Sequence, residues 1–376
     1  MMRAPHCALA AALITLTFTS CQDSVAPLTT EQALSHRVAD PASLVEHQIL
    51  PRETGDDSID WVPSANPAGA YHDVWLDPTN KSNPKLLVFM PGTNNRPSDY
   101  VYVAKEAASL GYHVIGLMFQ NNVGIDTACK VRAGRVEQPP ADCSGDTRLE
   151  VLEGQPYPSS RAHVTRGNGI YNRLTQLLIH LSDTPSYEGE GWSRFLEVDE
   201  GGQRVPKWSQ IAVAGHSQGA GQAALIAKLH HVNRVVMLSG PPDSRDDVHA
   251  DAWVSIGKTP AAKYFALFHS LEPLAPGIRA NLNALNMYRF GDPVFVTGKG
   301  DEQPFRGTHI LTIAPNLLPR NGSNFHGSTA RDLFTPLSCT LDVPPICTPV
   351  LAEAWRYLLG EPPNGGADKA LVARIP

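Results

Sequence analysis

The chain is long enough to bury a large core, and its charge is nearly balanced. It has 376 residues, of which 42% are hydrophobic and 18% are charged, and its formal net charge is −6. A doubly wound α/β chain of this length commonly remains one domain. Lys and Arg form no cluster, so the composition excludes an electrostatic footprint for nucleic acid or for anionic lipid.

The first 20 residues have the pattern of a signal peptide. Arg3 precedes an apolar stretch from Cys7 to Phe18, which is too short to span a bilayer but suits a signal h-region. The small residues before Cys21 resemble a bacterial lipoprotein cleavage box, which predicts lipidation of Cys21 and a membrane tether. Phe18 departs from the aliphatic residue usual in that box, so simple secretion stays open. Residues 21–46 are expected to form a polar tether, followed by the catalytic domain at 47–376.

Four cysteines remain once the signal peptide and Cys21 are set aside. Four cysteines allow three pairings, and proximity in sequence favours two local ones. The spacing C-x-x-C is absent, as are H-E-x-x-H, an EF-hand loop and a phosphate-binding glycine loop, so no metal or cofactor is expected. The favoured disulfides are Cys129 with Cys143, inside a predicted insertion near residues 122–160, and Cys339 with Cys347.

A glycine-rich turn carries a serine in the middle of the chain. The apolar run Ile211–Ala214 predicts a buried strand, the pentapeptide GHSQG at 215–219 follows, and small residues continue as a helix toward Leu229. Glycine two residues on either side of Ser217 lets the strand and the helix approach without a Cβ clash. This context, which a chance G-x-S-x-G would lack, predicts a nucleophile elbow that presents the Ser217 hydroxyl.

A serine nucleophile needs a histidine to take its proton and a carboxylate to orient that histidine. On this elbow both follow later in the chain, on loops after strands. Apolar runs at 233–239, 264–269 and 309–314 predict the sixth, seventh and eighth strands of an eight-stranded sheet. The acid usually follows the seventh strand, where Glu272 stands, and His326 in the loop after the eighth is the predicted base.

Two other carboxylates compete for the acid position. Asp243 follows the predicted sixth strand in the sequence SGPPD, and Glu is the less common acid, so Asp243 is the main alternative to Glu272. Asp292, in FGDP, is more typical of a solvated turn. Exchanging Glu272 and Asp243 separately for their amides distinguishes the two.

The tetrahedral intermediate of such a reaction needs hydrogen-bond donors for its oxyanion. The backbone N–H of Gln218, directly after the serine, is the first candidate. The apolar run 85–90 predicts a strand followed by PGTNN, which makes the backbone N–H of Thr93 the second candidate. Many relatives of this elbow carry His-Gly where this chain has Pro91-Gly92.

With these residues in place the chain resembles the α/β-hydrolase superfamily, and more narrowly a group of bacterial exported serine esterases and lipases. The resemblance covers the segments GHSQG, LVFMPGTNN, RVVMLSGPPD, YFALFH with SLEP, FHGSTARD, and the predicted helices GIYNRLTQLLIHL and AEAWRYLLG. It implies an α/β-hydrolase fold, a mostly parallel eight-stranded sheet with helices on both faces and a small cap or rim insertion. In such relatives the position matching Glu272 is more often Asp before proline.

The resemblance also implies an activity. The expected protein is an exported serine hydrolase that cleaves small-molecule or lipid esters through an acyl-enzyme, without a cofactor and as a monomer outside the cytoplasm. His216 before the serine resembles many esterases and lipases, which favours esters over peptides. The alternatives are the same triad acting on a polyester, a lactone or an amide, and a non-catalytic binding protein on a hydrolase fold.

Two stretches are candidates for the walls of the acyl pocket. The segment from Cys129 to Ser160 either overhangs the serine as a cap or rim, or is a disulfide-pinned surface loop without substrate contact. A second insert, Pro273 to Pro304, is the other candidate wall, with Trp253 and Tyr288 as aromatic contributors.

Overall fold

The computed structural model describes the chain from residue 44 to residue 360, apart from short gaps. The described ranges are 44–64, 69–80, 83–132, 134, 136–298, 305–342 and 345–360. They belong to one compact unit. The predicted signal peptide, Cys21 and the tether up to residue 43 lie outside the described residues.

A nine-stranded, mostly parallel sheet forms the centre, in the order β1-β2-β4-β3-β7-β8-β9-β11-β10. β2 is antiparallel to β1 and to β4, and every other neighbouring pair is parallel. The strands of this sheet are β1 Val45–Ile49, β2 His72–Leu76, β3 Leu86–Met90, β4 His113–Gly116, β7 Ile211–His216, β8 Arg234–Leu238, β9 Tyr264–His269, β10 Val294–Val296 and β11 Ile310–Ile313.

The expected eight-stranded sheet is wrong by one strand. The additional strand is β10, which pairs with β11 at the edge of the sheet and makes β11 the ninth strand rather than the eighth. β10 has only three residues, Val294–Val296, and its Phe295 is 52% exposed, so its apolar run is too short to indicate a strand in the sequence. β1 begins at Val45, inside the segment expected to be a tether. The sequence does not mark this edge strand, because its solvent-facing residues are polar and alternate with the others.

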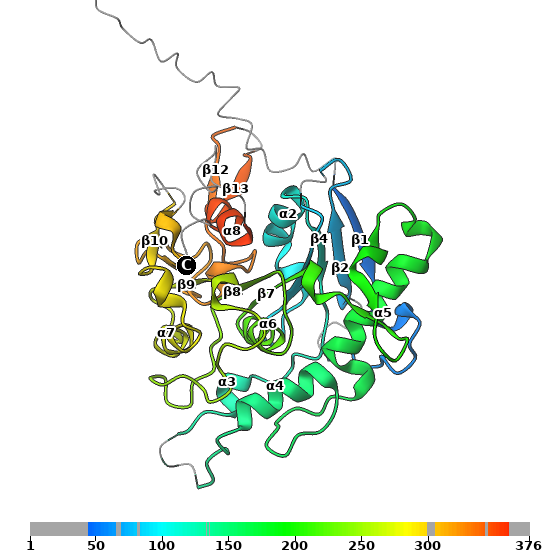
Figure 1. The fold of residues 1–376 in the computed structure, drawn as a ribbon. Helices are drawn as coiled ribbons and strands as arrows, with labels where there is room; N and C mark the ends of the chain where they lie inside the picture. The colour runs from blue at the N-terminus through cyan, green and yellow to red at the C-terminus, as the bar shows by residue number, and fades with distance from the viewer. Residues whose placement is uncertain are drawn as a thin grey trace, which may run out of the picture. The chain divides into compact units, whose positions relative to one another are not determined.

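Seven α-helices among the described residues cover the two faces of the sheet. They are α2 Val101–Ser109, α3 Ile125–Ala128, α4 Cys143–Glu153, α5 Ile170–Asp183, α6 Gln218–Leu229, α7 Ala275–Ala284 and α8 Ala352–Leu359. The helices expected from GIYNRLTQLLIHL and AEAWRYLLG are present as α5 and α8. α2 and α8 lie on one side of the sheet and α5, α6 and α7 on the other (Figure 1).

The strand sequences account for this three-layer α/β arrangement. Successive side chains of a strand face opposite sides of a sheet. In β3, Leu86 and Val88 join the apolar cluster that includes α5, α6 and α7, whereas Leu87 and Phe89 join the cluster of α2 and α8. All five residues of β3 are buried. Continuous apolar runs are therefore the signal of these strands, because both faces of the sheet are covered.

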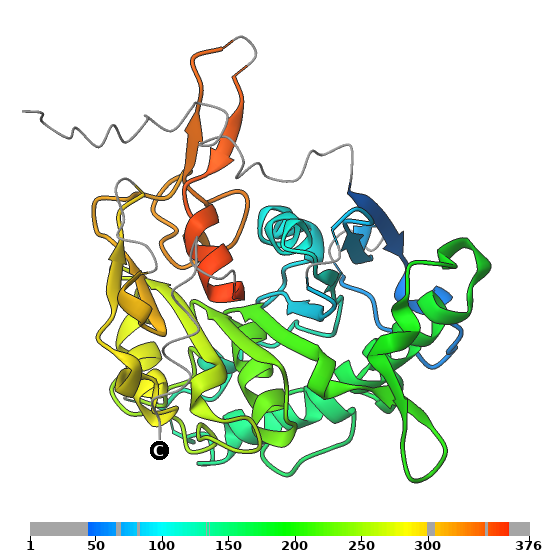
Figure 2. The ribbon, with the colours of Figure 1, turned by 45° about the horizontal axis from the view of Figure 1, so that its top comes forward.

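Four of the cysteines form the two local disulfides. Cys129 pairs with Cys143, and Cys339 pairs with Cys347, each with an S–S distance of 1.97 Å. The second disulfide joins β12 Leu337–Cys339 to β13 Cys347–Pro349, a two-stranded hairpin that stands out from the body of the domain (Figure 2). A further small sheet pairs β5 Leu196–Val198 with β6 Arg204–Pro206. The pairings favoured by the sequence are those of the structure.

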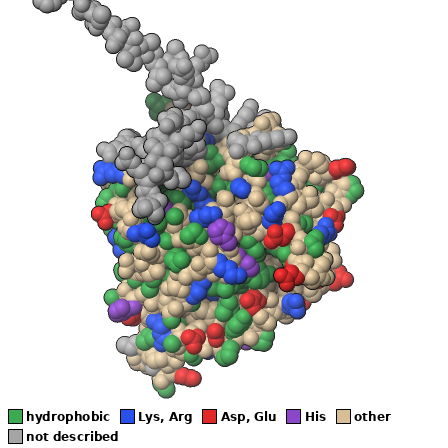
Figure 3. All heavy atoms as spheres, in the orientation of Figure 1, with side chains coloured by type: hydrophobic (Ala, Val, Ile, Leu, Met, Phe, Trp, Pro, Cys, Tyr) green, Lys and Arg blue, Asp and Glu red, His purple; other side chains and the backbone are tan. Residues whose placement is uncertain are grey.

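The exposed surface carries both signs of charge. On the face shown in Figure 3, acidic and basic side chains are scattered among apolar and neutral ones. Within the described ranges, no helix combines the length and the apolar character that a membrane span needs.

One buried carboxyl group makes the stability of the domain depend on pH. Burial raises the pKa of Asp73 in β2 to about 7, although Gln48 donates a hydrogen bond to its Oδ1 at 3.1 Å. Between about pH 4 and pH 7 the folded state keeps a proton that the unfolded state has lost. The contribution of Asp73 to the free energy of unfolding therefore falls as the pH rises through this window, and is level above it.

Asp73→Asn removes this dependence, because asparagine keeps an acceptor for Gln48 and does not ionise. The free energy of unfolding of the variant minus that of wild type is expected to be about 2–4 kcal/mol larger at pH 8 than at pH 4, because only wild type loses stability as the pH rises. Urea unfolding of both proteins at the two pH values measures this difference. A variant effect of equal size at pH 4 and pH 8 would contradict the assignment.

Candidate active site

The predicted site residues all follow strands that end at the same edge of the sheet. Thr93 lies after β3, Ser217 after β7, Glu272 after β9 and His326 after β11. These four strands run parallel, so their carboxyl ends lie together. Loops at this edge of an open α/β sheet are the usual place for a binding site.

Ser217 occupies a strained turn between β7 and α6. Its backbone has φ 56° and ψ −116°, which is unfavourable for a residue with a Cβ atom. The turn is held by a hydrogen bond from the Ser217 N–H to the Leu238 carbonyl oxygen at 2.9 Å. A Cβ at Gly215 would lie 2.3 Å from the Gly219 carbonyl carbon, and one at Gly219 would lie 1.9 Å from the Met90 oxygen. Both glycines of GHSQG are thus required by close backbone approach.

Glu272 and His326 are in direct contact. The His326 Nδ1 lies 2.5 Å from the Glu272 Oε2, and the Glu272 side chain is fully buried whereas that of His326 is 23% exposed. The other Glu272 oxygen, Oε1, accepts hydrogen bonds from the His269 N–H at 2.9 Å and from the Ser239 hydroxyl at 3.0 Å. Glu272 is therefore fixed as an acceptor for the Nδ1 side of the imidazole, and its own loop and Ser239 hold it there.

The two competing carboxylates lie elsewhere. Both oxygens of Asp243 accept hydrogen bonds from the Arg148 guanidinium, at 2.5 and 2.6 Å, and both side chains are fully buried. Asp292 is exposed on the loop before β10. Among the described carboxylates considered for the acid position, Glu272 is the one that contacts His326.

His326 packs against His216, the residue before Ser217, and makes no direct hydrogen bond with Ser217. The rings of His216 and His326 have centroids 4.9 Å apart, and His216 Nε2 lies 3.0 Å from the His326 carbonyl oxygen. The Ser217 hydroxyl makes no hydrogen bond with any residue in the described ranges. Catalytic hydrogen bonds of this kind are often long before substrate binds.

Two backbone N–H groups near the turn of Ser217 have no acceptor among the described residues. Neither the Thr93 N–H nor the Gln218 N–H donates a hydrogen bond to another residue of the described chain. The Thr93 hydroxyl contacts the Gln218 side-chain amide at 2.8 Å, and with the amide nitrogen turned toward its acceptors that nitrogen lies 3.0 Å from the Val123 carbonyl oxygen and 3.2 Å from that of Asn121. Asn121 in turn donates to the Gly92 carbonyl oxygen at 2.7 Å. These bonds fix the loop after β3 against the first turn of α6.

A chain of hydrogen bonds that the sequence does not indicate links the loop after β3 to the loop of His326. The Gly92 N–H donates to the Tyr100 hydroxyl oxygen at 3.1 Å, and that hydroxyl lies 3.0 Å from His216 Nδ1. Tyr100 therefore donates to Nδ1, and His216 Nε2–H donates to the His326 carbonyl oxygen. Burial lowers the pKa of His216 well below its usual range, and the nearby His326 imidazole adds to this. A neutral His216 thus ties the loop of Thr93 to the loop of His326.

The two stretches expected to wall the acyl pocket are part of the helical layer. α4, inside the insertion near 122–160, has seven buried residues and packs against α5 and α6. In the described part of the second insert, Pro273 to Pro304, the chain forms α7 and the edge strand β10. The Trp253 indole N–H is bound to Asp243 at 2.8 Å, and Tyr288 is partly buried against the core.

The described ranges hold no group of three or more His, Cys, Asp or Glu side chains that could bind a metal ion. No protein-family model matches the chain. A comparison with curated proteins also finds no match. The function therefore has to be inferred from the geometry of the site.

Proposed function

We propose that this protein is a serine hydrolase with the α/β-hydrolase fold, which cleaves carboxylic esters through an acyl-enzyme intermediate. The observation that carries the proposal is the 2.5 Å contact between His326 Nδ1 and Glu272 Oε2, at the sheet edge where Ser217 occupies its strained turn. A carboxylate on Nδ1 favours the imidazole tautomer whose Nε2 accepts a proton. This is the arrangement that activates a serine hydroxyl.

The proposed reaction has two halves. Ser217 Oγ attacks the ester carbonyl carbon while His326 Nε2 takes the hydroxyl proton, and the N–H groups of Gln218 and Thr93 donate to the oxyanion. Collapse of the tetrahedral intermediate expels the alcohol, which receives the proton from His326. A water molecule then attacks the acyl-enzyme by the same route and releases the acid. Glu272 accepts the hydrogen bond from the Nδ1–H of His326 and stabilises the imidazolium in both halves.

The chemistry of the leaving group favours an ester as substrate. An alcohol leaves with less assistance than an amine does, so the proton held by His326 suffices for esters. We also propose that the protein acts outside the cytoplasm, which the two disulfides support because disulfides persist in oxidising compartments.

The test is hydrolysis of p-nitrophenyl esters of increasing acyl-chain length, compared with p-nitroanilides of the same acyl groups. We expect turnover of the esters, with a preferred chain length, and much slower turnover of the anilides. The matched control is His326→Ala, which should lose the activity while remaining folded. A folded wild-type protein that hydrolyses no ester of the series would contradict the proposal.

A further inference from the structure

Arg148 of α4 connects the insertion to the candidate oxyanion donor. The side chain of Arg148 has no exposed surface. Its Nε and Nη2 donate to the two carboxylate oxygens of Asp243, and its Nη1 donates to the Gln218 carbonyl oxygen at 2.8 Å. Gln218 is the first residue of α6, and its own N–H is one of the two available donors beside Ser217. A planar guanidinium can make all of these bonds at once, whereas an ammonium group cannot.

The contact between Arg148 and Gln218 requires a glycine in α6. A Cβ atom at Gly221 would lie 2.1 Å from the Arg148 Cζ. The nucleophile elbow itself requires Gly215 and Gly219, but it gives no reason for a third glycine at 221. The third glycine is explained by the guanidinium, which lies directly against the backbone of the first helical turn.

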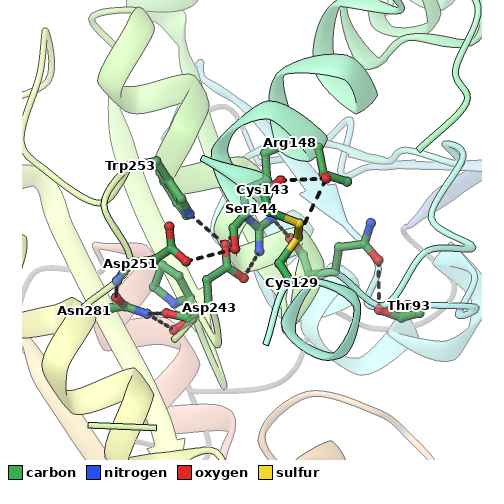
Figure 4. A network of polar contacts seen from close by, with 12 residues as sticks. Thr93, Cys129, Cys143, Ser144, Arg148, Asp243, Asp251, Trp253 and Asn281 are labelled. Atoms are coloured by element: carbon green, nitrogen blue, oxygen red, sulfur yellow. Dashed lines mark hydrogen bonds and ion pairs between the residues drawn. A yellow bond between two sulfur atoms is a disulfide. The ribbon is translucent and has the colours of Figure 1, made fainter. Parts of the chain in front are cut away.

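Two further side chains hold Asp243, those of Trp253 and of Asn281 in α7 (Figure 4). The Trp253 indole N–H donates to Asp243 Oδ2 at 2.8 Å, and the Asn281 side-chain amide of α7 donates to the Asp243 carbonyl oxygen at 2.5 Å. Asn281 Oδ1 accepts from the Asp251 N–H at 3.1 Å. Asp243 is thus a fixed partner, which holds the orientation of the Arg148 guanidinium.

α4 is tied to the domain at two other points. Its first residue, Cys143, is buried in the disulfide with Cys129, and the next residue, Ser144, donates to Asp251 Oδ2 at 2.8 Å. Moving α4 away from α6 would break these contacts and leave the charges of a buried ion pair without partners, which is costly. The insertion is therefore a fixed support of the site.

The charges of Arg148 and Asp243 indicate how this ion pair affects the site. A cation beside the first turn of a helix is disfavoured by the helix dipole. Asp243 neutralises Arg148, so the pair adds little net field at the position of an oxyanion. The contribution of Arg148 is accordingly the orientation of the Gln218 backbone.

We propose that Arg148 is a positioning residue of the hydrolase site, which orients the Gln218 backbone so that its N–H faces the oxyanion. The disulfide-pinned insertion then supports the oxyanion donor from behind instead of moving over the serine as a lid. This inference rests on the proposed function.

The test removes the Gln218 contact without leaving a buried charge unpaired. In Arg148→Met/Asp243→Asn both charges are lost, while the amide oxygen of the introduced asparagine still accepts from Trp253, and replacement of a buried ion pair by neutral residues is often tolerated. A second variant, Arg148→Lys, keeps the charge opposite Asp243 but not the fork that reaches Gln218. The matched control is Glu106→Gln/Arg356→Met, which removes a buried ion pair of 2.8 Å between α2 and α8 on the other face of the sheet.

The readouts are kcat, KM and the affinity for an arylboronic acid, whose tetrahedral adduct with Ser217 places an oxygen at the oxyanion position. We expect both Arg148 variants to lose at least about tenfold in kcat and in boronic acid affinity, with KM changed by less than about threefold. The control pair should keep both values near wild type, which separates positioning from a general loss of stability.

Two results would overturn the inference in different ways. Folded Arg148 variants with wild-type kcat, or losses of equal size in the control pair, would defeat the positioning role and leave the proposed function intact. A wild-type protein without Ser217-dependent turnover and without covalent labelling of Ser217 would defeat the proposed function, and this inference with it.

Discussion

Replacing Ser217 with Ala is expected to reduce kcat for ester hydrolysis by about 10⁴-fold or more. The substitution removes the proposed nucleophile, so only the proposed oxyanion donors and substrate binding would remain to assist an attack by water. The fold should be unaffected, because the Ser217 hydroxyl makes no hydrogen bond in the described ranges and alanine has the same backbone strain at φ 56°. Steady-state kinetics on the preferred p-nitrophenyl ester and a thermal unfolding curve measure both effects.

The matched control for this variant is Ser193→Ala, which changes an exposed serine in the turn before β5. It should keep wild-type kcat. Turnover by Ser217→Ala within about tenfold of wild type would remove Ser217 from the mechanism, since loss of a nucleophile costs far more than that.

Replacing Glu272 with Gln is expected to reduce kcat by about 10³- to 10⁴-fold. The side-chain carbonyl oxygen of the introduced glutamine can still accept from His269 and Ser239, so the loop around residue 272 should persist. The amide N–H₂ group would then face His326 Nδ1 and force that nitrogen to become an acceptor. The imidazole would carry its proton on Nε2, where it cannot take the proton of Ser217.

Asp243→Asn is the comparison that separates the two carboxylates. It leaves the buried Arg148 without its counter-charge, which is expected to lower the free energy of unfolding by about 3–5 kcal/mol. Its loss of kcat should be at least about 100-fold smaller than that of Glu272→Gln. Near-wild-type kcat in Glu272→Gln, with a large loss in a folded Asp243→Asn, would reverse the assignment.

The sequence contains local signals for much of this architecture. Strands buried on both faces, such as β3 and β9, are continuous apolar runs, and the elbow is marked by glycines that have no room for a Cβ. Chain order alone then brought Glu272 and His326 forward as partners, and the structure places them in contact. The edge strand β1 was missed because its exposed positions are polar, and β10 because its apolar run is only three residues long.

The supporting contacts of the site could not be predicted in the same way. Arg148 and Asp243 are 95 residues apart in sequence, and Tyr100 and His216 are 116 residues apart. Such pairs form only when separate elements pack, and neither residue type nor spacing marks them beforehand. One indirect signal existed at Gly221, a third glycine that the elbow itself does not require.

The most direct test of the proposed mechanism is the site of covalent labelling by a serine-directed phosphonate, located by peptide mass spectrometry. The proposed mechanism predicts one adduct, on Ser217, which is absent in Ser217→Ala and forms much more slowly in His326→Ala because the base no longer takes the hydroxyl proton. A folded wild-type protein that is not labelled at Ser217, or that is labelled there equally fast without His326, would contradict it.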